Sequence, residues 1–230
     1  MMPGASGGPL WVTVEGLNGV GKTYLAGRLA ARLGKGCRLI SELTDLGTDH
    51  LSGQVIAALQ RPGGTFLRTG HPLTETFALL ALKVLEYERI REQTASGGCG
   101  VPVVVEDRGV DTVAVYQAAI LAHDDPSEDA ADLVRRVHET AALWRPQPHL
   151  TLMLVDDLDA CLTRYAARLG MPVSAADRQL LAEVAELYAN LAAAEPDRIT
   201  VVNRAGRDEQ ETLAEMQAHC RALLQRTGRP

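Results

Sequence analysis

The sequence predicts an α/β fold, in which helices cover both faces of a five-stranded parallel sheet. First, short apolar runs alternate along the chain with segments whose apolar residues recur at helical spacing. Second, residues 101–105 form a β-branched run broken only by Pro102, which is typical of a central parallel strand. Third, a glycine-rich segment, residues 16–23, joins the first apolar run to the first helical pattern. Repeated strand-to-helix units of this kind build a sheet that is covered on both sides.

Each expected element follows from its local pattern. The expected strands are short apolar runs, and they cover residues 11–15, 37–41, 101–105, 149–155 and 198–202. The expected helices have apolar residues at helical spacing, and they cover residues 22–33, 51–59, 73–93, 110–122, 129–144, 158–169, 175–194 and 208–225. The first half of the helix at 73–93 is apolar nearly all round, so that half should be buried. Gly170, Met171 and Pro172 interrupt the helical pattern, and this break favours a mobile lid over approximately residues 164–178.

Composition limits the classes of function. Residues 1–9 are rich in glycine and proline and are expected to be a disordered leader, whereas residues 10–230 show no break and predict a single domain. The net charge of −6 argues against a nucleic-acid polymer as the main partner. No apolar run approaches the length that spans a membrane, so we expect a cytoplasmic protein. The four cysteines lie far apart, which suggests neither a zinc site nor a disulfide framework.

Residues 16–23 have the spacing of a phosphate-binding loop, with Gly-Lys-Thr following a glycine and any four residues. The predicted nucleotide contacts in this loop come from Gly16, Asn18, Gly19, Gly21, Lys22 and Thr23. Backbone N–H groups at a helix N-terminus attract anions, and glycines let them approach closely. Lys22 would neutralise phosphate oxygens and Thr23 would ligate Mg²⁺. The alternative is a glycine-rich turn that binds nothing, but the strand and helix on either side favour the loop.

A second group of charged residues, Glu106, Asp107 and Arg108, follows the expected central strand. At the carboxyl end of that strand these side chains should face the phosphate loop. Asp107, with Glu106, could hold Mg²⁺, and Arg108 could grip a phosphate with its planar fork. The alternative is a surface ion pair at a strand end. Positioning and charge neutralisation are what phosphoryl transfer needs from a protein, so we favour the functional interpretation.

Together these segments resemble the thymidylate kinase family of nucleoside monophosphate kinases. The segments that carry the resemblance keep the family's order and spacing, and they are residues 14–23, 71–75, 107–117 and 145–151, with Arg164 and Arg168 where the family's lid has arginines. The resemblance implies a three-layer P-loop fold, ATP and Mg²⁺ as cofactors, and a homodimer formed through the long helices. It also implies that Thr112, Tyr116 and Gln117 contact the acceptor, although Tyr116 is equally consistent with a core position.

The acceptor half of this pattern departs from the family. Asn18 stands where the family usually has aspartate, and Glu42 follows the second strand without the family's neighbouring arginine. The family's base-reading arginine falls on Lys83, which is a point donor rather than a planar fork. The family's Asp-Arg-Tyr ends here in Gly109, which removes an aromatic wall. We therefore expect the part of the site that binds ATP to be intact and the part that binds the acceptor to differ from the family. The acceptor could then be a modified or non-thymine nucleotide.

We therefore predict an ATP- and Mg²⁺-dependent kinase acting on a (deoxy)nucleoside monophosphate. Its expected catalytic residues are Lys22, Glu42, Asp107, Arg108, Arg164 and Arg168. One alternative is a kinase whose acceptor is a hydroxyl of a nucleoside or a sugar-bearing metabolite, in which Glu42 would act as the base. Another is a nucleotide-binding switch protein with little turnover. Lys83 could also be a polar residue on the outer side of its helix, and the i, i+4 spacing of Arg164 and Arg168 also fits a solvated helix face.

Overall fold

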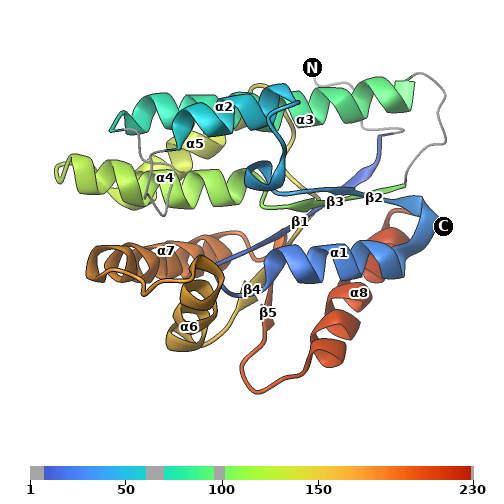
Figure 1. The fold of residues 1–230 in the computed structure, drawn as a ribbon. Coiled ribbons are helices and arrows are strands. Elements are labelled where there is room, and N and C mark those ends of the chain that lie inside the picture. The colour runs from blue at the N-terminus through green and yellow to red at the C-terminus, as the bar shows by residue number, and fades with distance from the viewer. Residues whose placement is uncertain (1–7, 61–69, 96–101, 229–230) are drawn as a thin grey trace.

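The computed structural model describes residues 8–60, 70–95 and 102–228, and its centre is a five-stranded parallel sheet (Figure 1). The strands are β1 (Leu10–Gly16), β2 (Cys37–Ile40), β3 (Val103–Asp107), β4 (Leu150–Val155) and β5 (Ile199–Asn203). Their order across the sheet is β2-β3-β1-β4-β5, and every neighbouring pair is parallel. The predicted α/β fold class is confirmed. The carboxyl ends of β1 and β3 lie side by side, which is where ligands bind in open sheets of this kind.

Helices cover both faces of the sheet (Figure 1). They are α1 (Lys22–Leu33), α2 (Leu51–Leu59), α3 (Pro72–Ala95), α4 (Val110–Asp124), α5 (Ala130–Ala142), α6 (Leu158–Leu169), α7 (Ala175–Ala194) and α8 (Glu209–Arg226). Helices α1 and α8 pack together against one face, and α4 and α7 lie on the other, with α3 and α5 packed against α4. In the described part of the chain, no helix is long and apolar enough to cross a membrane.

The central strands are buried on both faces, and one of those faces is polar. All seven residues of β1 are buried, and Val12 and Val14 belong to the main apolar core. Thr13 points the other way and pairs in register with Glu106 on β3 and with Thr151 on β4. The face of β1 that carries Thr13 and Glu15 therefore holds a row of buried polar groups, each of which needs a partner.

Most expected boundaries agree with the structure, and one difference changes the site. Helices α1, α2, α6 and α7 begin and end where the sequence pattern predicts. The central strand β3 covers Val103–Asp107 rather than residues 101–105, so Glu106 and Asp107 lie inside the strand. Successive strand residues face opposite sides of a sheet. Glu106 and Asp107 consequently point to opposite faces, and only Asp107 faces α1. Residues 1–7 of the expected leader lie outside the described residues.

The turn between α6 and α7 is sharply defined. Helix α6 ends at Gly170, whose φ of 69° is the left-handed conformation that stops a helix. Helix α7 begins at Ala175, where Ser174 accepts a hydrogen bond from the backbone N–H of Asp177. The expected lid is thus built from the end of α6, a short connection and the start of α7.

Candidate functional site

The phosphate loop connects β1 to α1, and close packing of its backbone against α6 fixes its shape. Gly16, Gly19 and Gly21 all have positive φ. A Cβ on Gly19 would lie 2.0 Å from the carbonyl oxygen of Cys161 on α6, so only glycine fits between the loop and that helix. Arg164 Nε donates to the Gly19 carbonyl at 2.7 Å, and Arg204 donates to the Val20 carbonyl. With its carbonyls bonded to these arginines, the loop can turn its N–H groups toward an anion.

Lys22 lies inside this loop with 3% of its surface exposed. Its ammonium donates to the carbonyl oxygens of Gly16 at 2.8 Å and Leu17 at 2.7 Å. Burial and the nearby positive charge of Arg108 lower the Lys22 pKa to about 7. In the described part of the chain its hydrogen-bond partners are carbonyls, and a buried ammonium of this kind gains strongly from an added anion such as a phosphate.

Asp107 and Thr23 offer oxygen atoms beside the loop. The Asp107 carboxylate is 1% exposed, and within the described ranges neither of its oxygens has a hydrogen-bond partner. Burial raises its pKa, and the nearby Thr23 hydroxyl and Arg108 charge offset part of that effect. An unsatisfied buried carboxylate next to a hydroxyl fits Mg²⁺, which prefers oxygen ligands. The described residues contain no group of three metal-binding side chains, so the ion would also need phosphate oxygens and water.

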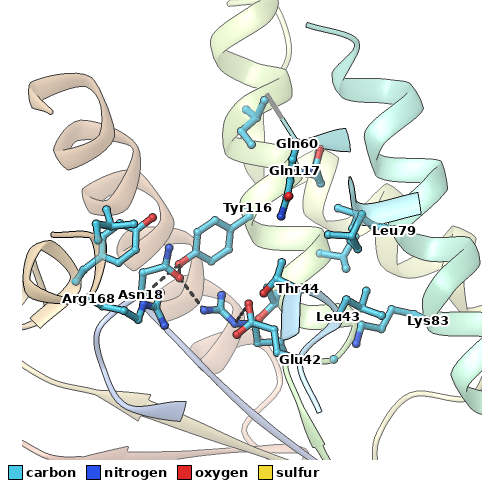
Figure 2. A pocket seen from close by; sticks show the side chains of 18 residues that line it. Asn18, Glu42, Leu43, Thr44, Gln60, Leu79, Lys83, Tyr116, Gln117 and Arg168 are labelled. Atoms are coloured by element: carbon cyan, nitrogen blue, oxygen red, sulfur yellow. Dashed lines mark hydrogen bonds and ion pairs between the residues drawn. The ribbon is translucent and has the colours of Figure 1, made fainter. Parts of the chain in front are cut away.

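Arg108 connects the phosphate loop to a second compartment. Its φ of 61° is unusual for a residue with a side chain, and marks a backbone held by its surroundings. Its guanidinium lies 2.9 Å from Glu42 Oε1 and donates to Asn18 Oδ1 at 2.9 Å (Figure 2). Burial disfavours the charged form, but the effect of Glu42 and the smaller effects of Tyr116, Asp107 and Tyr188 together outweigh burial and raise the pKa of Arg108.

Beside Arg108 lies a cavity of about 440 Å³, large enough for a nucleotide-sized ligand (Figure 2). One end is polar and is lined by Asn18, Glu42, Thr44, Arg108 and Arg168. The rest of the lining includes the apolar residues Ile56, Leu79, Val113 and Ile120, together with Lys83, Tyr116 and Gln117. Eight of the residues proposed from the sequence line this one cavity: Asn18, Glu42, Lys83, Arg108, Thr112, Tyr116, Gln117 and Arg168.

Two of the expected acceptor residues are oriented by neighbours. The Tyr116 hydroxyl accepts from the Asn18 backbone N–H at 3.1 Å, which links the cavity wall to the phosphate loop. Thr76 donates to Gln117 Oε1 at 3.1 Å. Because that oxygen is engaged, the Gln117 amide is set to offer its NH₂ group as a donor to a ligand.

The prediction that Glu106 is a metal ligand is wrong. The shift in β3 turns its carboxylate to the sheet face opposite Asp107. There it lies 3.1 Å from the Lys83 ammonium and 2.9 Å from Arg145 Nη2, with no exposed surface. Lys83 itself is 1% exposed, so it is not a polar residue on the outer side of its helix.

The two arginines of α6 occupy different places. Arg168 lines the cavity at its polar end, where its positive charge acts on both Glu42 and Asp45. The Arg164 side chain is 43% exposed and pairs with Asp156 at 2.6 Å while it holds the Gly19 carbonyl. Arg168 therefore faces the second compartment, and Arg164 faces the phosphate loop.

The structure also explains the departure at Gly109. A Cβ at this position would lie 2.6 Å from Thr13 Cγ2 and 3.1 Å from Glu15 Oε1. The end of β3 approaches β1 too closely there for a side chain. The aromatic wall expected from the family is thus excluded by packing, and not only by the sequence change.

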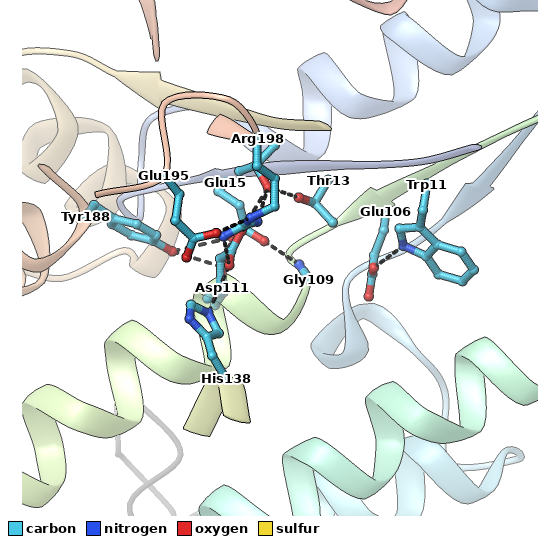
Figure 3. A network of polar contacts seen from close by, with 12 residues as sticks. Trp11, Thr13, Glu15, Glu106, Gly109, Asp111, His138, Tyr188, Glu195 and Arg198 are labelled. Carbon is cyan, nitrogen blue, oxygen red and sulfur yellow. Dashed lines mark hydrogen bonds and ion pairs between the residues drawn. The ribbon is translucent and has the colours of Figure 1, made fainter. Parts of the chain in front are cut away.

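Sequence reasoning missed Glu15 and the network around it (Figure 3). Glu15 is fully buried and accepts hydrogen bonds from the Gly109 N–H at 2.6 Å and from the Thr112 hydroxyl. Burial and the negative charge of Asp111 raise the Glu15 pKa to about 8. Glu15 thus fixes the turn that follows Arg108. The one available signal was an acidic residue at the end of an otherwise apolar strand.

Asp111 anchors the other half of this network. It binds Arg198 through both carboxylate oxygens, at 2.7 and 3.0 Å, and lies 2.9 Å from His138 Nε2. These contacts join the start of α4 to α5 and to the segment before β5 (Figure 3). They keep the pKa of Asp111 well below its usual range despite burial. Glu15, Asp111, His138 and Arg198 support the site without lining its cavity, whereas their partners Gly109 and Thr112 do line it.

Comparisons with known proteins give the family and the fold of this chain. A model of the thymidylate kinase family matches residues 14–215. The thymidylate kinase of Deinococcus radiodurans is 30% identical over 226 residues, covering 91% of this chain and 95% of that protein. A probable thymidylate kinase of Methanoculleus marisnigri is 26% identical over 201 residues, covering 84% and 85%. The crystal structure of thymidylate kinase from Ehrlichia chaffeensis matches with a TM-score of 0.65 at 18% identity, covering 93% of this chain and 99% of that one.

Proposed function

Because this chain belongs to the thymidylate kinase family of nucleotide kinases, we propose that it transfers the γ-phosphoryl group of ATP to a (deoxy)nucleoside 5′-monophosphate. ATP would bind along residues 16–23. Asp107 and Thr23 would hold Mg²⁺, which would neutralise the negative charge of the phosphates. The acceptor would occupy the adjacent cavity, with its phosphate toward Arg108 and its base between Leu79 and Gln117.

The observation that carries this proposal is the position of Arg108 between the loop and the cavity. Its guanidinium is permanently charged and planar, so it can bind two phosphate oxygens at once. Arg168 lines the same end of the cavity and supplies a second cation, where the chain lacks the family's arginine before Glu42. Two cations beside Lys22 suit an acceptor that itself carries a phosphate.

The state of Glu42 favours a phosphate acceptor over a hydroxyl acceptor. Burial would raise its pKa, but the charges of Arg108 and Lys22, with a hydrogen bond from Thr44, lower it overall. A general base works best when its pKa lies near the working pH, so a carboxylate this well paired is poorly suited to remove a proton from a hydroxyl. A phosphate monoester is already a nucleophile and needs no such base.

A coupled assay of ADP release tests the proposal directly. Purified protein with ATP and Mg²⁺ is assayed against a panel of nucleosides and nucleoside monophosphates. We expect turnover that requires both Mg²⁺ and a monophosphate acceptor. A slow ATP hydrolysis that no acceptor accelerates would instead indicate a nucleotide-binding switch.

The pKa of Lys22 predicts that ATP binding takes up a proton. In the free protein that pKa is lowered to about 7, so near pH 8 most of the Lys22 side chain is neutral. Bound phosphates raise it again, because they stabilise the ammonium form. Affinity for ATP should therefore fall as the pH rises above about 7. Calorimetry in two buffers of different ionisation enthalpy should show proton uptake, and Lys22→Met should remove it. Equal apparent enthalpies in both buffers would contradict this prediction.

We also propose a homodimer that forms through α3. Leu73 and Phe77 lie one helical turn apart and expose 59% and 56% of their surfaces, so α3 presents an apolar stripe outside the core. A second copy of this chain would cover it. Light scattering should give twice the mass of one chain for the wild type and the mass of one chain for Phe77→Glu. Val201→Glu, at a 48% exposed position on β5, is the control and should stay dimeric. A monomeric wild type would exclude the dimer.

A further inference from the structure

A buried network of four charged groups adjoins the wall of the acceptor cavity. Its members are Lys83 and Glu86 on α3, Glu106 on β3, and Arg145 in the segment before β4, and all are at most 7% exposed. Two positive and two negative groups give a net charge of zero. Of the four, Lys83 is the one that lines the cavity.

Glu106 is the centre of this network, because four donors surround its carboxylate. Lys83 Nζ lies 3.1 Å and Arg145 Nη1 3.3 Å from Oε1. Arg145 Nη2 donates to Oε2 at 2.9 Å, and the indole N–H of Trp11 donates to the same oxygen. Although burial would raise it, the charges of Arg145 and Lys83 lower the Glu106 pKa to about 2. The carboxylate is therefore a fixed anion with a fixed orientation.

The Lys83 ammonium is held from two sides. Glu86 Oε2 lies 3.0 Å and Glu106 Oε1 3.1 Å from Nζ. Burial lowers the Lys83 pKa, but the two carboxylates outweigh burial and raise it overall, so the side chain is charged. An ammonium has three protons, and these two acceptors account for two of them. Arg145 Nη1 also donates to the Lys83 backbone carbonyl at 3.2 Å, which ties the helix itself to Glu106.

Among the described residues no third acceptor contacts the Lys83 ammonium, which leaves one N–H for the cavity that Lys83 lines. A flexible lysine could turn its ammonium in many directions, whereas this one is restrained by a buried anion that cannot move away from Trp11 and Arg145. Stability alone does not account for such a network, because apolar side chains of similar volume commonly fill a core at least as well as buried ion pairs.

We propose that Glu106 is a positioning residue, which directs a single N–H of Lys83 toward a carbonyl oxygen on the base of the acceptor. This inference deepens the proposed function and depends on it. Glu106 would not touch the acceptor but would act through Lys83. A single fixed donor selects bases with a carbonyl at that place over bases with an amino group. An amino group there would face the Lys83 N–H, and neither of these two donors would have an acceptor.

The test compares acceptor binding in four proteins: wild type, Glu106→Gln, Lys83→Met and the double variant. The ligands are thymidine monophosphate, deoxycytidine monophosphate and 2-deoxyribose 5-phosphate, which has no base. Glu106→Gln should weaken thymidine monophosphate binding about tenfold or more, because the charged hydrogen bond from Lys83 to the base is lost. The affinity for the base-free ligand should stay within about twofold of the wild-type value. In the Lys83→Met background the same change should have little further effect. Glu88→Gln, on the exposed side of α3, is the matched control and should bind like the wild type.

A general structural role would give a different pattern. If Glu106→Gln weakened all three ligands equally, or added its full effect to that of Lys83→Met, the positioning role would be overturned. Should Glu106→Gln fail to fold, Trp11→Phe removes one donor to Glu106 without changing any charge. It should reduce the preference for thymidine over deoxycytidine monophosphate, and an unchanged preference would overturn the proposal. If the wild type bound none of the three ligands, the proposed function would fail as well.

Discussion

Replacing Lys22 with alanine is expected to lower kcat by roughly a thousandfold or more, because a preorganised charge at the transferred phosphoryl group is lost. In the free protein the ammonium is 3% exposed and is bound only to the carbonyls of Gly16 and Leu17 among the described residues. Steady-state kinetics with saturating ATP and acceptor measures the effect.

The same substitution should not lower the stability of the free protein. Burial lowers the Lys22 pKa to about 7, so at neutral pH and below the folded state holds a proton less favourably than the unfolded chain does. Removing the ammonium relieves that cost, and thermal unfolding of Lys22→Ala should begin no lower than that of the wild type. Lys35→Ala, at an exposed position after α1, is the control for both measurements. Activity of Lys22→Ala within a few-fold of the wild type would contradict the assignment of the phosphate loop.

Arg108→Ala is expected to raise the KM for the acceptor and to lower kcat, together costing at least about a hundredfold in kcat/KM. The contact with the acceptor phosphate would persist into the transition state, so both constants should change. Glu42→Gln should cost less than about tenfold, because a phosphate acceptor needs no base. Its role would be to hold the Arg108 guanidinium, from which it lies 2.9 Å.

The order of these two effects separates the phosphate acceptor from a hydroxyl acceptor. With a hydroxyl acceptor, Glu42→Gln would remove the base and cost roughly a hundred- to ten-thousandfold, with loss of the acidic limb of the pH–rate profile. Arg108→Lys is a useful companion variant, since it keeps the charge but loses the planar fork. We expect it to recover only part of the activity lost in Arg108→Ala.

Local patterns were sufficient to predict the fold and the position of the glycine-rich loop between β1 and α1. The strand, the glycine spacing and the start of α1 at Lys22 are all set within about a dozen residues. The structure places the Lys22 ammonium within that same loop, bonded to residues five and six positions away. Helix α6 was likewise bounded correctly, because Gly170 is a local stop signal.

The direction of Glu106 could not be predicted in the same way. A shift of β3 by two residues moved Glu106 and Asp107 from a loop into a strand, where neighbours face opposite sides. The partner that fixes Glu106 is Arg145, 39 positions along the chain. No local pattern reports such a contact. A sequence motif therefore showed that charged residues meet near this strand, but only packing showed which of them faces α1 and the loop before it.

Two further features depend on close approach between strands. Gly109 must be small because Thr13 of the neighbouring strand lies against it. The raised pKa of Glu15 requires both its burial and the charge of Asp111, 96 positions along the chain. Both features shape the turn that carries Arg108, and both follow from the pairing of β1 with β3.

The most direct test of this account is a comparison of thymidine with thymidine monophosphate as acceptors under identical ATP and Mg²⁺ concentrations. Product analysis by chromatography identifies which phosphate bond forms. The account predicts that the monophosphate is converted to the diphosphate and that the nucleoside is turned over at least about a hundredfold more slowly, since it brings no phosphate to Arg108 and Arg168. Faster phosphorylation of the nucleoside, with Glu42→Gln as inactive as Arg108→Ala, would contradict it.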